Sequence, residues 1–453
     1  MLSSYIVIAL RYSLATVLVL TGVCSCAQTT TAQNTIPLQA SKSKRSASVF
    51  QQTKISSQKE KHTLTRVQVK NTQDDSTKLS LKEELSRLPV YSSLSEAIKD
   101  PLHVYRLELS DPADMKAITQ LTDTETKPGS AANTSLAQFT NLRELSLFNT
   151  VLPKLSASVG QLKKLQVLNL TNSQLQSLPP EIGQLLSLEE LNLSLNPIES
   201  LPSEITQLSK LRELTMIQTR LKTLPENIGK LQKLQSLNLY GSQLTALPES
   251  IGNLKQLQSL NINSNALTRL PASLGELSSL EHLSAEYNQL SALPESIGGL
   301  NKLTSLNLTS NQLSGLPSSL GNMKELKSLQ LSDNRLTALP ESMGKLTALK
   351  DLNLGNNHLT SLPESVGSLT KLNKLFVNKN QLATLPESIG KLTELKNMGL
   401  QENPLTKLPD GIGELRQLES LQLDASHLPQ AELDKLRLNM SKTLVPQWAI
   451  PSR

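Results

Sequence analysis

Side chains able to perform covalent or metal chemistry are few in this 453-residue chain. The two cysteines, Cys24 and Cys26, both lie near the N-terminus, so the rest of the sequence offers no thiol nucleophile and no Cys-based metal site. The five histidines are scattered without the spacing of metal ligands. His282 and Glu286, both outward on one predicted strand, come nearest to a catalytic dyad, but no nucleophile accompanies them. We therefore expect a non-enzymatic protein without a metal or cofactor.

The first 26 residues carry the pattern of an export signal. Arg11 precedes an apolar run over residues 13–23, which is the order of charge and hydrophobicity in a secretory signal peptide. The stretch from Tyr5 to Cys24 could barely span a bilayer, but Arg11 lies inside it. A cleaved signal over residues 1–26 is therefore the preferred interpretation over a permanent transmembrane anchor.

Cys26 is the expected site of covalent modification. The segment Val23-Cys24-Ser25-Cys26 resembles the bacterial lipobox, in which the final cysteine becomes the lipid-modified first residue of the mature protein. The resemblance implies a membrane anchor, which needs two or more acyl chains to be stable. Cleavage after Ala27 is the alternative, because Ser25-Cys26-Ala27 fits the small-x-small rule. That alternative gives a secreted protein.

Residues 27–79 are predicted to form a disordered tether. They are rich in Ser, Thr, Gln and Lys and poor in apolar side chains. Such a segment buries too little surface to offset the entropy lost on ordering.

A 23-residue unit then recurs without insertion or deletion. In the unit that begins at Leu234, Leu237 and Leu239 follow with the inward spacing of a short strand. Leu247-Pro248 starts the return path, since proline suits a first helical turn or an extended arm. Ile251-Gly252 closes the loop, and its glycine indicates a tight turn or close backbone contact. The thirteen units begin at Leu142, Leu165, Leu188, Leu211, Leu234, Leu257, Leu280, Leu303, Leu326, Leu349, Leu372, Leu395 and Leu418.

A small hydrogen-bonding residue follows each strand. The chain turns inward there, so its backbone groups need a partner, and a stacked asparagine ladder would supply one. Eight units place asparagine at this position: Asn196, Asn265, Asn288, Asn311, Asn334, Asn357, Asn380 and Asn403. The others place Thr150, Ser173, Thr219, Ser242 and Ser426 there.

This unit, with its Leu-Pro-Glu-Ser-Ile-Gly-x-Leu segment, resembles the leucine-rich-repeat superfamily. It is most similar to the 23-residue subtype of plant Ras-group proteins, animal Ras-pathway scaffolds and their bacterial relatives. The resemblance implies an α/β fold: a horseshoe-shaped solenoid with a concave parallel β-sheet, which binds proteins or peptides. Because a single unit cannot shelter its own leucines, the solenoid needs neighbours and helical caps at both ends.

The N-terminal cap and an irregular first repeat are assigned to residues 80–141. Ser93 and Glu96 have the spacing of a capping box at the start of a short helix. A first strand is expected at Val104–Leu109, and the extra residues at 122–134 are predicted to form a protruding loop.

The thirteen repeats occupy residues 142–428, and residues 429–453 are predicted to form the C-terminal cap. Pro429–Met440 is expected to be an amphipathic helix, with Val445 and Trp448 completing the lid.

The outward strand positions should form the concave surface of the solenoid. Their asparagines either hydrogen-bond an extended peptide or a glycan, or simply keep an exposed sheet soluble. Only 2% of the residues are aromatic, so exposed rings at these positions are candidate binding anchors. The candidate binding residues are Tyr240, Tyr287, Phe376, Phe148, Asn238, Asn261 and Asn307.

Composition and charge narrow the partner class. The net charge of +6 is modest, and no basic stripe with stacking aromatics is present, so nucleic acid is not expected as a partner. The leading hypothesis is a binder of a protein or peptide, lipid-anchored in the bacterial outer membrane or at the cell surface, or secreted. The alternative is an intracellular signalling scaffold, which requires that the N-terminal segment is not a signal.

Overall fold

A computed structural model describes residues 80–111, 114, 136–424 and 426–440 of the chain. The chain divides into two units, Met1–Asp74 and Asp75–Arg453, and everything below concerns the second.

Several sequence predictions lie outside the described residues. These are the signal segment, Cys26, the tether, the loop at 122–134, and the lid residues Val445 and Trp448. Within the described part of the chain, no helix has both the length and the apolar character that a bilayer crossing requires.

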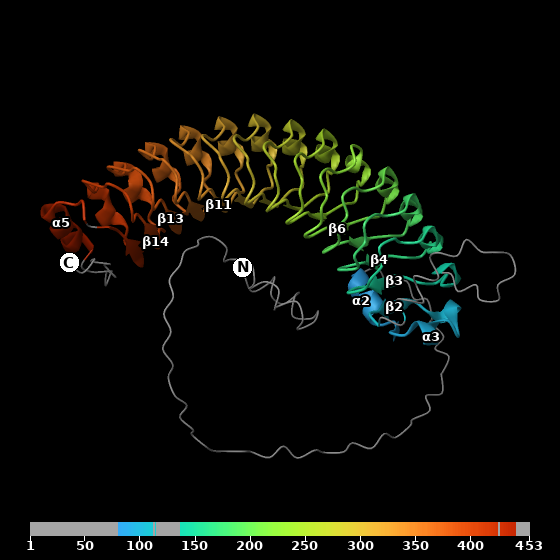
Figure 1. Ribbon diagram of the computed structural model, residues 1–453. Helices are drawn as coiled ribbons and strands as arrows, with labels where there is room; N and C mark the ends of the chain where they lie inside the picture. Colours follow the sequence, from blue (N-terminus) through green and yellow to red (C-terminus); the bar gives the residue numbers. More distant parts are fainter. Residues whose placement is uncertain (1–79, 112–113, 115–135, 425, 441–453) are drawn as a thin grey trace, which may run out of the picture. The chain divides into compact units, whose positions relative to one another are not determined.

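Fifteen parallel strands form one sheet, and their spatial order is their order in the sequence. The second unit is a solenoid whose strands lie on the inner side of an arch and whose short helices lie on the outer side (Figure 1), so the predicted solenoid with a concave parallel sheet is confirmed. The strands are β1 Val90–Tyr91, β2 Arg106–Leu109, β3 Glu144–Leu147, β4 Val167–Asn169, β5 Glu190–Asn192, β6 Glu213–Thr215, β7 Ser236–Asn238, β8 Ser259–Asn261, β9 His282–Ser284, β10 Ser305–Asn307, β11 Ser328–Gln330, β12 Asp351–Asn353, β13 Lys374–Phe376, β14 Asn397–Gly399 and β15 Ser420–Gln422.

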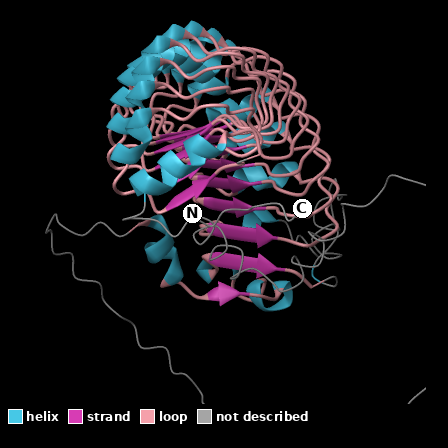
Figure 2. Ribbon diagram, turned by 90° about the vertical axis from the view of Figure 1, so that its left-hand side faces the viewer, coloured by secondary structure: helices cyan, strands magenta, loops and turns pink. Residues whose placement is uncertain are grey.

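Strand register follows the repeat. From β3 onward each residue pairs with the residue 23 positions later, as in Leu237↔Leu260 and Leu260↔Leu283. In the view of Figure 2 the parallel strands lie one above another, with most of the helices along one side and loops along the other. Equivalent residues of successive 23-residue units, here called coils, therefore form continuous rows.

The core is one unbroken stack of leucines. In the coil that starts at Leu234, the side chains of Leu237, Leu239 and Leu244 are fully buried, and so are those of Ile251 and Leu254. A single apolar cluster extends from Leu94 to Leu436. Each coil therefore completes the burial of its neighbours, as expected for a quasi-one-dimensional fold.

The return path of each coil is a short 3₁₀ helix. Its proline stands just before the helix in extended conformation, as at Pro248 (φ −71°, ψ 151°). Side chains three apart eclipse in a 3₁₀ helix. Glu341 and Lys345, which are four residues apart and would face each other in an α-helix, accordingly form no ion pair among the described residues. The helices are η3 Ala157–Gln161, η4 Pro180–Gln184, η5 Ser203–Gln207, η6 Ile228–Lys230, η7 Glu249–Asn253, η8 Ala272–Glu276, η9 Glu295–Gly299, η10 Ser318–Asn322, η11 Glu341–Lys345, η12 Glu364–Ser368, η13 Glu387–Lys391 and η14 Asp410–Glu414.

The recurrent glycine permits close contact between these helices. A Cβ added to Gly298 would lie 2.3 Å from the carbonyl oxygen of Ser319 in the next coil, which is shorter than any real contact. Close approach, not a special backbone conformation, therefore explains this glycine.

The N-terminal cap differs from its prediction. Ser93 precedes helix α3, Leu94–Ala97, but its hydroxyl contacts Ser95 and does not cap the helix. The capping box belongs to helix α2, Leu81–Ser86, where Glu83 N–H donates to the Ser80 hydroxyl and Ser80 N–H donates to the Glu83 carboxylate.

Between this cap and the repeats the strands are shorter than expected. The first predicted strand begins at Arg106, not Val104, and the unpredicted β1 precedes it. The remaining short helices here are η1 Pro101–His103 and η2 Leu136–Gln138.

At the other end, helix α5, Gln430–Met440, lies against the last coil. Leu436 is buried, and Leu433 is half-buried against the core. These two leucines close the open end of the leucine stack.

Candidate binding surface on the concave face

The concave surface is defined here as the outward residues of β3–β15 together with the residues equivalent to Tyr240 and Gly241 in each coil. In β7, for example, Leu237 is buried while Ser236 and Asn238 face outward. Strand direction and the fixed register place such residues in rows across the arch.

The asparagines at the strand exits form one row of equivalent hydrogen bonds. The Oδ1 of Asn288 accepts from the backbone N–H of Leu267 in the preceding coil at 3.1 Å. Its Nδ2 donates to the carbonyl oxygens of Ile262, Ala285 and Glu286 at 3.0–3.2 Å. All eight asparagines of this ladder make the same set of bonds. They satisfy buried backbone groups and are not available to a ligand.

In the N-terminal coils, serine or threonine replaces asparagine at most ladder positions, and these shorter side chains make fewer hydrogen bonds. The hydroxyls of Thr219 and Ser242 lie 2.9 Å apart, and Ser242 also donates to the carbonyl oxygen of Met216 at 3.1 Å. The hydroxyl of Thr150 is buried without a partner in the described part of the chain.

A second row of asparagines lies at the ends of the strands, and two of them, Asn238 and Asn261, use only half of the amide. The Oδ1 of Asn238 accepts from the N–H of Tyr240 at 3.2 Å, and that of Asn261 accepts from Asn263 at 3.0 Å. The Nδ2 groups of Asn238 and Asn261 have no hydrogen-bond partner among the described residues. The oxygen thus shapes the exit from the strand, and the NH₂ group remains as a donor on the concave surface.

The four predicted aromatic anchors do not form one patch. Tyr240 is 38% exposed and Tyr287 is 60% exposed, and the two lie two coils apart. Phe148 and Phe376 are half-buried, in the coils of β3 and β13.

A hollow of about 300 Å³ surrounds Phe376. A Cβ added to Gly399 would lie 2.7 Å from the Phe376 ring, so the ring extends over the neighbouring strand. Of the residues that line this hollow, the sequence analysis had identified only Phe376 as a candidate binding residue. The hollow is lined by Ser332, Asp333, Asn353, Gly355, Asn356, Phe376, Asn378 and Lys379.

The residue before each ladder position is left-handed, which the sequence did not reveal. Twelve successive coils have φ between 52° and 66° here, and only one of the residues is a glycine, Gly241. Asn and Asp adopt this conformation readily, whereas a bulky residue adopts it at a cost. Tyr287, at φ 52°, bears that cost, and its ring is 60% exposed.

Glu286 directly precedes Tyr287 and lies two coils from Tyr240, in the row that follows the strands. It is half-buried, and burial raises the pKa of its carboxyl group. Its Oε1 accepts from the Nδ2 of Asn307, which opposes that rise. His282 is exposed in β9 of the same coil, and the described residues contain no cluster of three potential metal ligands.

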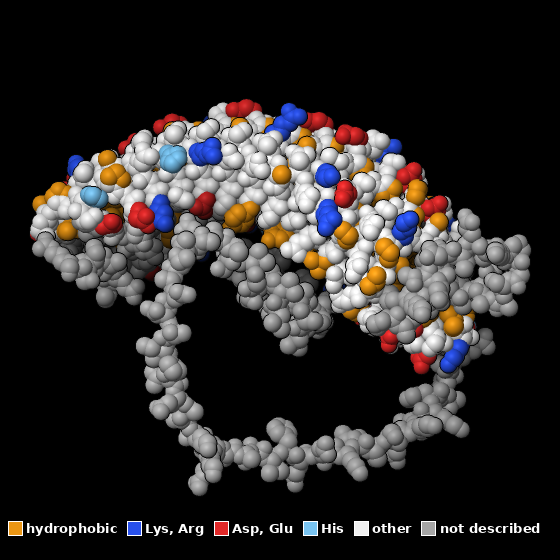
Figure 3. All heavy atoms as spheres, in the orientation of Figure 1, with side chains coloured by type: hydrophobic (Ala, Val, Ile, Leu, Met, Phe, Trp, Pro, Cys, Tyr) orange, Lys and Arg blue, Asp and Glu red, His pale blue; other side chains and the backbone are white. Residues whose placement is uncertain are grey.

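The N-terminal coils carry an acidic cluster. Burial raises the pKa of Glu190 to about 7, and repulsion from Glu213 on the next strand adds to the shift. At the adjoining edge, Arg143 contacts Glu84 of α2 at 3.0 Å, and Arg212 contacts Glu189 at 3.1 Å. On the face visible in Figure 3, cationic and anionic side chains are interspersed.

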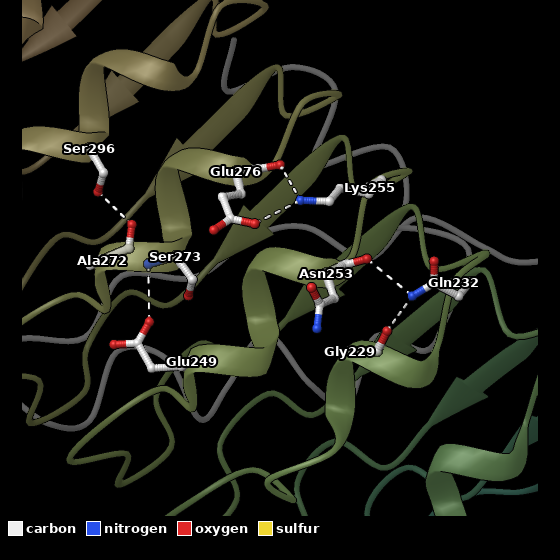
Figure 4. Close-up of polar contacts among 9 residues, drawn as sticks. All are labelled: Gly229, Gln232, Glu249, Asn253, Lys255, Ala272, Ser273, Glu276 and Ser296. Carbon is white, nitrogen blue, oxygen red and sulfur yellow. Dashed lines mark hydrogen bonds and ion pairs between the residues drawn. The ribbon is translucent and has the colours of Figure 1, made fainter.

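The convex side has a polar groove of about 490 Å³ between η6 and η7. Figure 4 shows the contacts that join successive coils around it. Gln232 donates to the carbonyl oxygens of Gly229 and Asn253, and Lys255 reaches the carboxylate of Glu276 at 3.1 Å. Beyond the groove, Ser273 N–H donates to Glu249 at 3.1 Å, and the hydroxyl of Ser296 donates to the carbonyl of Ala272. These residues bind one another and tie the coils together.

Family models match the repeats. A leucine-rich repeat region matches residues 202–289 and 341–438, and two leucine-rich-repeat models match residues 163–221 and residues 302–323 and 325–346. No curated protein matches the sequence.

Solved structures resemble the solenoid. A leucine-rich-repeat protein of Leptospira interrogans is 31% identical, with a TM-score of 0.60 over 80% of this chain and 100% of that one. The PEPR1–AtPEP1 complex is 29% identical, with a TM-score of 0.52 over 63% and 45% of the two chains. An internalin of Listeria monocytogenes is 25% identical, with a TM-score of 0.52 over 64% and 83%.

Proposed function

The chain belongs to the leucine-rich-repeat superfamily, and on that premise we propose that it binds a protein or peptide along its concave surface. The superfamily's fold is typical of protein-binding modules, and one similar structure is a complex of PEPR1 with AtPEP1.

The observation that carries the proposal is the row of half-used amides. The Oδ1 atoms of Asn238 and Asn261 are held by backbone N–H groups, so their Nδ2 donors have a fixed orientation. Neighbouring strands are about 4.8 Å apart, so the donors repeat at that interval across the arch. Carbonyl oxygens of an extended chain are suitable acceptors for such donors. A glycan would present hydroxyl acceptors to the same row and is the weaker candidate, since no ring lies beside these two amides except Tyr240.

Aspartate variants separate the two halves of the amide. Asn238→Asp with Asn261→Asp keeps the oxygen acceptors and removes the donors. We expect the full-length protein to lose about tenfold in affinity for binders selected from a displayed peptide library, because hydrogen-bond donors are replaced by acceptors.

The matched control is Asn253→Asp with Asn322→Asp, which places the same two charges on exposed convex positions. Its affinity should stay unchanged. Equal losses in both double variants, or no selected binder for the wild type, would argue against the concave surface as the binding face.

We further propose that the protein is exported and anchored by a lipid on Cys26, with secretion after cleavage at Ala27 as the alternative. This proposal rests on the N-terminal sequence. The competing proposal is an intracellular signalling scaffold of the Ras-group subtype. Radiolabelled fatty acid should enter the wild type and Cys24→Ala but not Cys26→Ala. A protein that takes up no label, keeps its first 26 residues and is found in the cytoplasmic fraction would favour the intracellular scaffold.

A further inference from the structure

We propose that Glu286, Tyr240 and Tyr287 form a seat for one cationic side chain, lysine or arginine, of a bound peptide. The inference rests on the proposed function, because it specifies one residue of the ligand that the concave surface would take.

Tyr240 belongs to the coil that starts at Leu234, and Glu286 and Tyr287 belong to the coil that starts at Leu280, with one coil between them. Tyr240, Asn263 and Glu286 are equivalent residues of three successive coils, and the backbone joins them in order. Gly241 N–H donates to the Asn263 carbonyl at 2.9 Å, and Ser264 N–H donates to the Glu286 carbonyl at 2.8 Å. Two strand spacings therefore separate the backbones of Tyr240 and Glu286, about 10 Å. Asn263, whose short side chain accepts from the Glu286 N–H through its Oδ1, is the equivalent residue between them.

Glu286 lacks a counter-charge that some concave acids have. Glu144 pairs with Arg106 at 2.6 Å and Asp351 with Lys374 at 3.7 Å, whereas Glu190 and Glu213 form no ion pair among the described residues. Among the described residues Glu286 has no cationic partner, and its carboxylate accepts instead from the neutral amide of Asn307.

A network of neutral groups fixes the place of this carboxylate. Asn263 Oδ1 accepts from the backbone N–H of Glu286 at 2.8 Å, and Asn307 is held in turn by Thr309 N–H at 3.1 Å. Burial raises the pKa of Glu286, so the charged form is costly without a counter-ion. An approaching ammonium or guanidinium group would remove that cost.

The tyrosines supply the second half of the recognition. A cation over an aromatic face is attracted by the negative face of the ring. The ring of Tyr287 is 60% exposed and that of Tyr240 is 38% exposed, so both are accessible to a cation on a bound peptide.

A metal ion fits this seat poorly. Divalent cations with oxygen ligands need six or more donors, and a single carboxylate does not supply them. A basic side chain needs only one carboxylate and an aromatic face. One carboxylate and two tyrosine rings therefore favour a basic side chain of a peptide over a metal ion.

The test uses the full-length protein and two sets of probes. The first set is pairs of displayed peptides that bind the protein and differ only by lysine or arginine against norleucine or citrulline. We expect the cationic member to bind about tenfold more tightly, because a hydrogen bond to a charged group is worth more than a neutral one. Glu286→Gln should abolish this preference, and Tyr240→Ala with Tyr287→Ala should reduce it.

Glu281→Gln is the matched control, since it removes one negative charge from an exposed residue of the same coil. It should keep the preference for the cation. A wild type without that preference, or a preference that survives Glu286→Gln, would overturn the proposed seat.

The second probe is N-acetyl-arginine amide alone, followed by tyrosine NMR signals of wild type and Glu286→Gln. Shifts that require Glu286, in a protein that selects no peptide, would support the cation seat while rejecting the proposed function. Peptide selection without cation preference would do the reverse, so the two failures are distinguishable.

Discussion

At the scale of single residues, one residue type, asparagine, does two different jobs in this protein. In the ladder its whole amide is used by buried backbone groups, whereas at the strand ends Asn238 and Asn261 use only the oxygen. Sequence reasoning anticipated the ladder, because a small polar residue recurs after every strand. It did not anticipate the left-handed row, because Tyr287, Leu195 and Lys379 there share no chemistry. That conformation is imposed by the turn between coils and leaves no compositional trace.

Removing one ladder amide should destabilise the fold. Asn311→Ala leaves the N–H of Leu290 without an acceptor, whereas the carbonyls of Ala285 and Leu308 each keep one donor, from Asn288 and Asn334. A buried unsatisfied group costs about 1–3 kcal/mol, so we expect a loss of about 2 kcal/mol in the free energy of unfolding. Urea denaturation measures it. Asn301→Ala, at an exposed position, should have almost no effect, and equal stability of the two variants would refute the ladder's structural role.

Glu190 should make stability depend on pH. Its folded-state pKa is raised to about 7 from an ordinary value of 4.5, so the native state holds a proton that the unfolded chain has released between these values. Stability therefore falls as pH rises through this window and stays low above it. Glu190→Gln should flatten the dependence and be more stable than wild type at pH 8, as judged by thermal unfolding. The exposed Glu226→Gln is the control, and an unchanged pH profile in Glu190→Gln would contradict the assignment.

At the scale of elements, the sequence predicted which helices and strands exist better than it predicted where each of them begins and ends. The short strands were predicted at the positions where they occur from β3 onward, since alternate leucines mark them. The helix start was assigned to Ser93, although Ser80 carries the capping box. Both serines have a glutamate three residues later, so the local pattern is the same. The contact of Glu84 with Arg143, 3.0 Å away but distant in sequence, is absent from that local pattern.

The 3₁₀ helices should tolerate side chains only where space exists. Gly298→Ala would bring its Cβ 2.3 Å from the Ser319 carbonyl oxygen, so neighbouring coils must separate. We expect a loss of about 1–3 kcal/mol from overpacking, measured by chemical denaturation. Gly315→Ala meets nothing within 4 Å and should be neutral or slightly stabilising. A similar loss in both variants would show that close packing of the helices is not the cause.

At the scale of the whole molecule, the fixed register makes the coils interchangeable as structural units. Deleting residues 303–325 removes one full coil, and Lys302 then leads into Leu326 at the same phase. We expect this variant to unfold cooperatively with a slightly smaller urea m-value, since less surface is exposed on unfolding. Deleting residues 303–320 shifts the phase and should abolish cooperative unfolding. Identical circular dichroism and unfolding of the two deletions would contradict the nearest-neighbour account.

The half-used amides have a consequence for how a ligand finds its place. A row of nearly identical donors is periodic, so a chain that used these donors alone could slide by one step and meet equivalent contacts. Several staggered alignments would then have similar energies. A local irregularity is needed to select one alignment, and among the described concave residues the stretch from Tyr240 to Tyr287 provides such a mark. The repeated amide donors would thus contribute affinity, and the residues between Tyr240 and Tyr287 would determine the alignment of the bound chain.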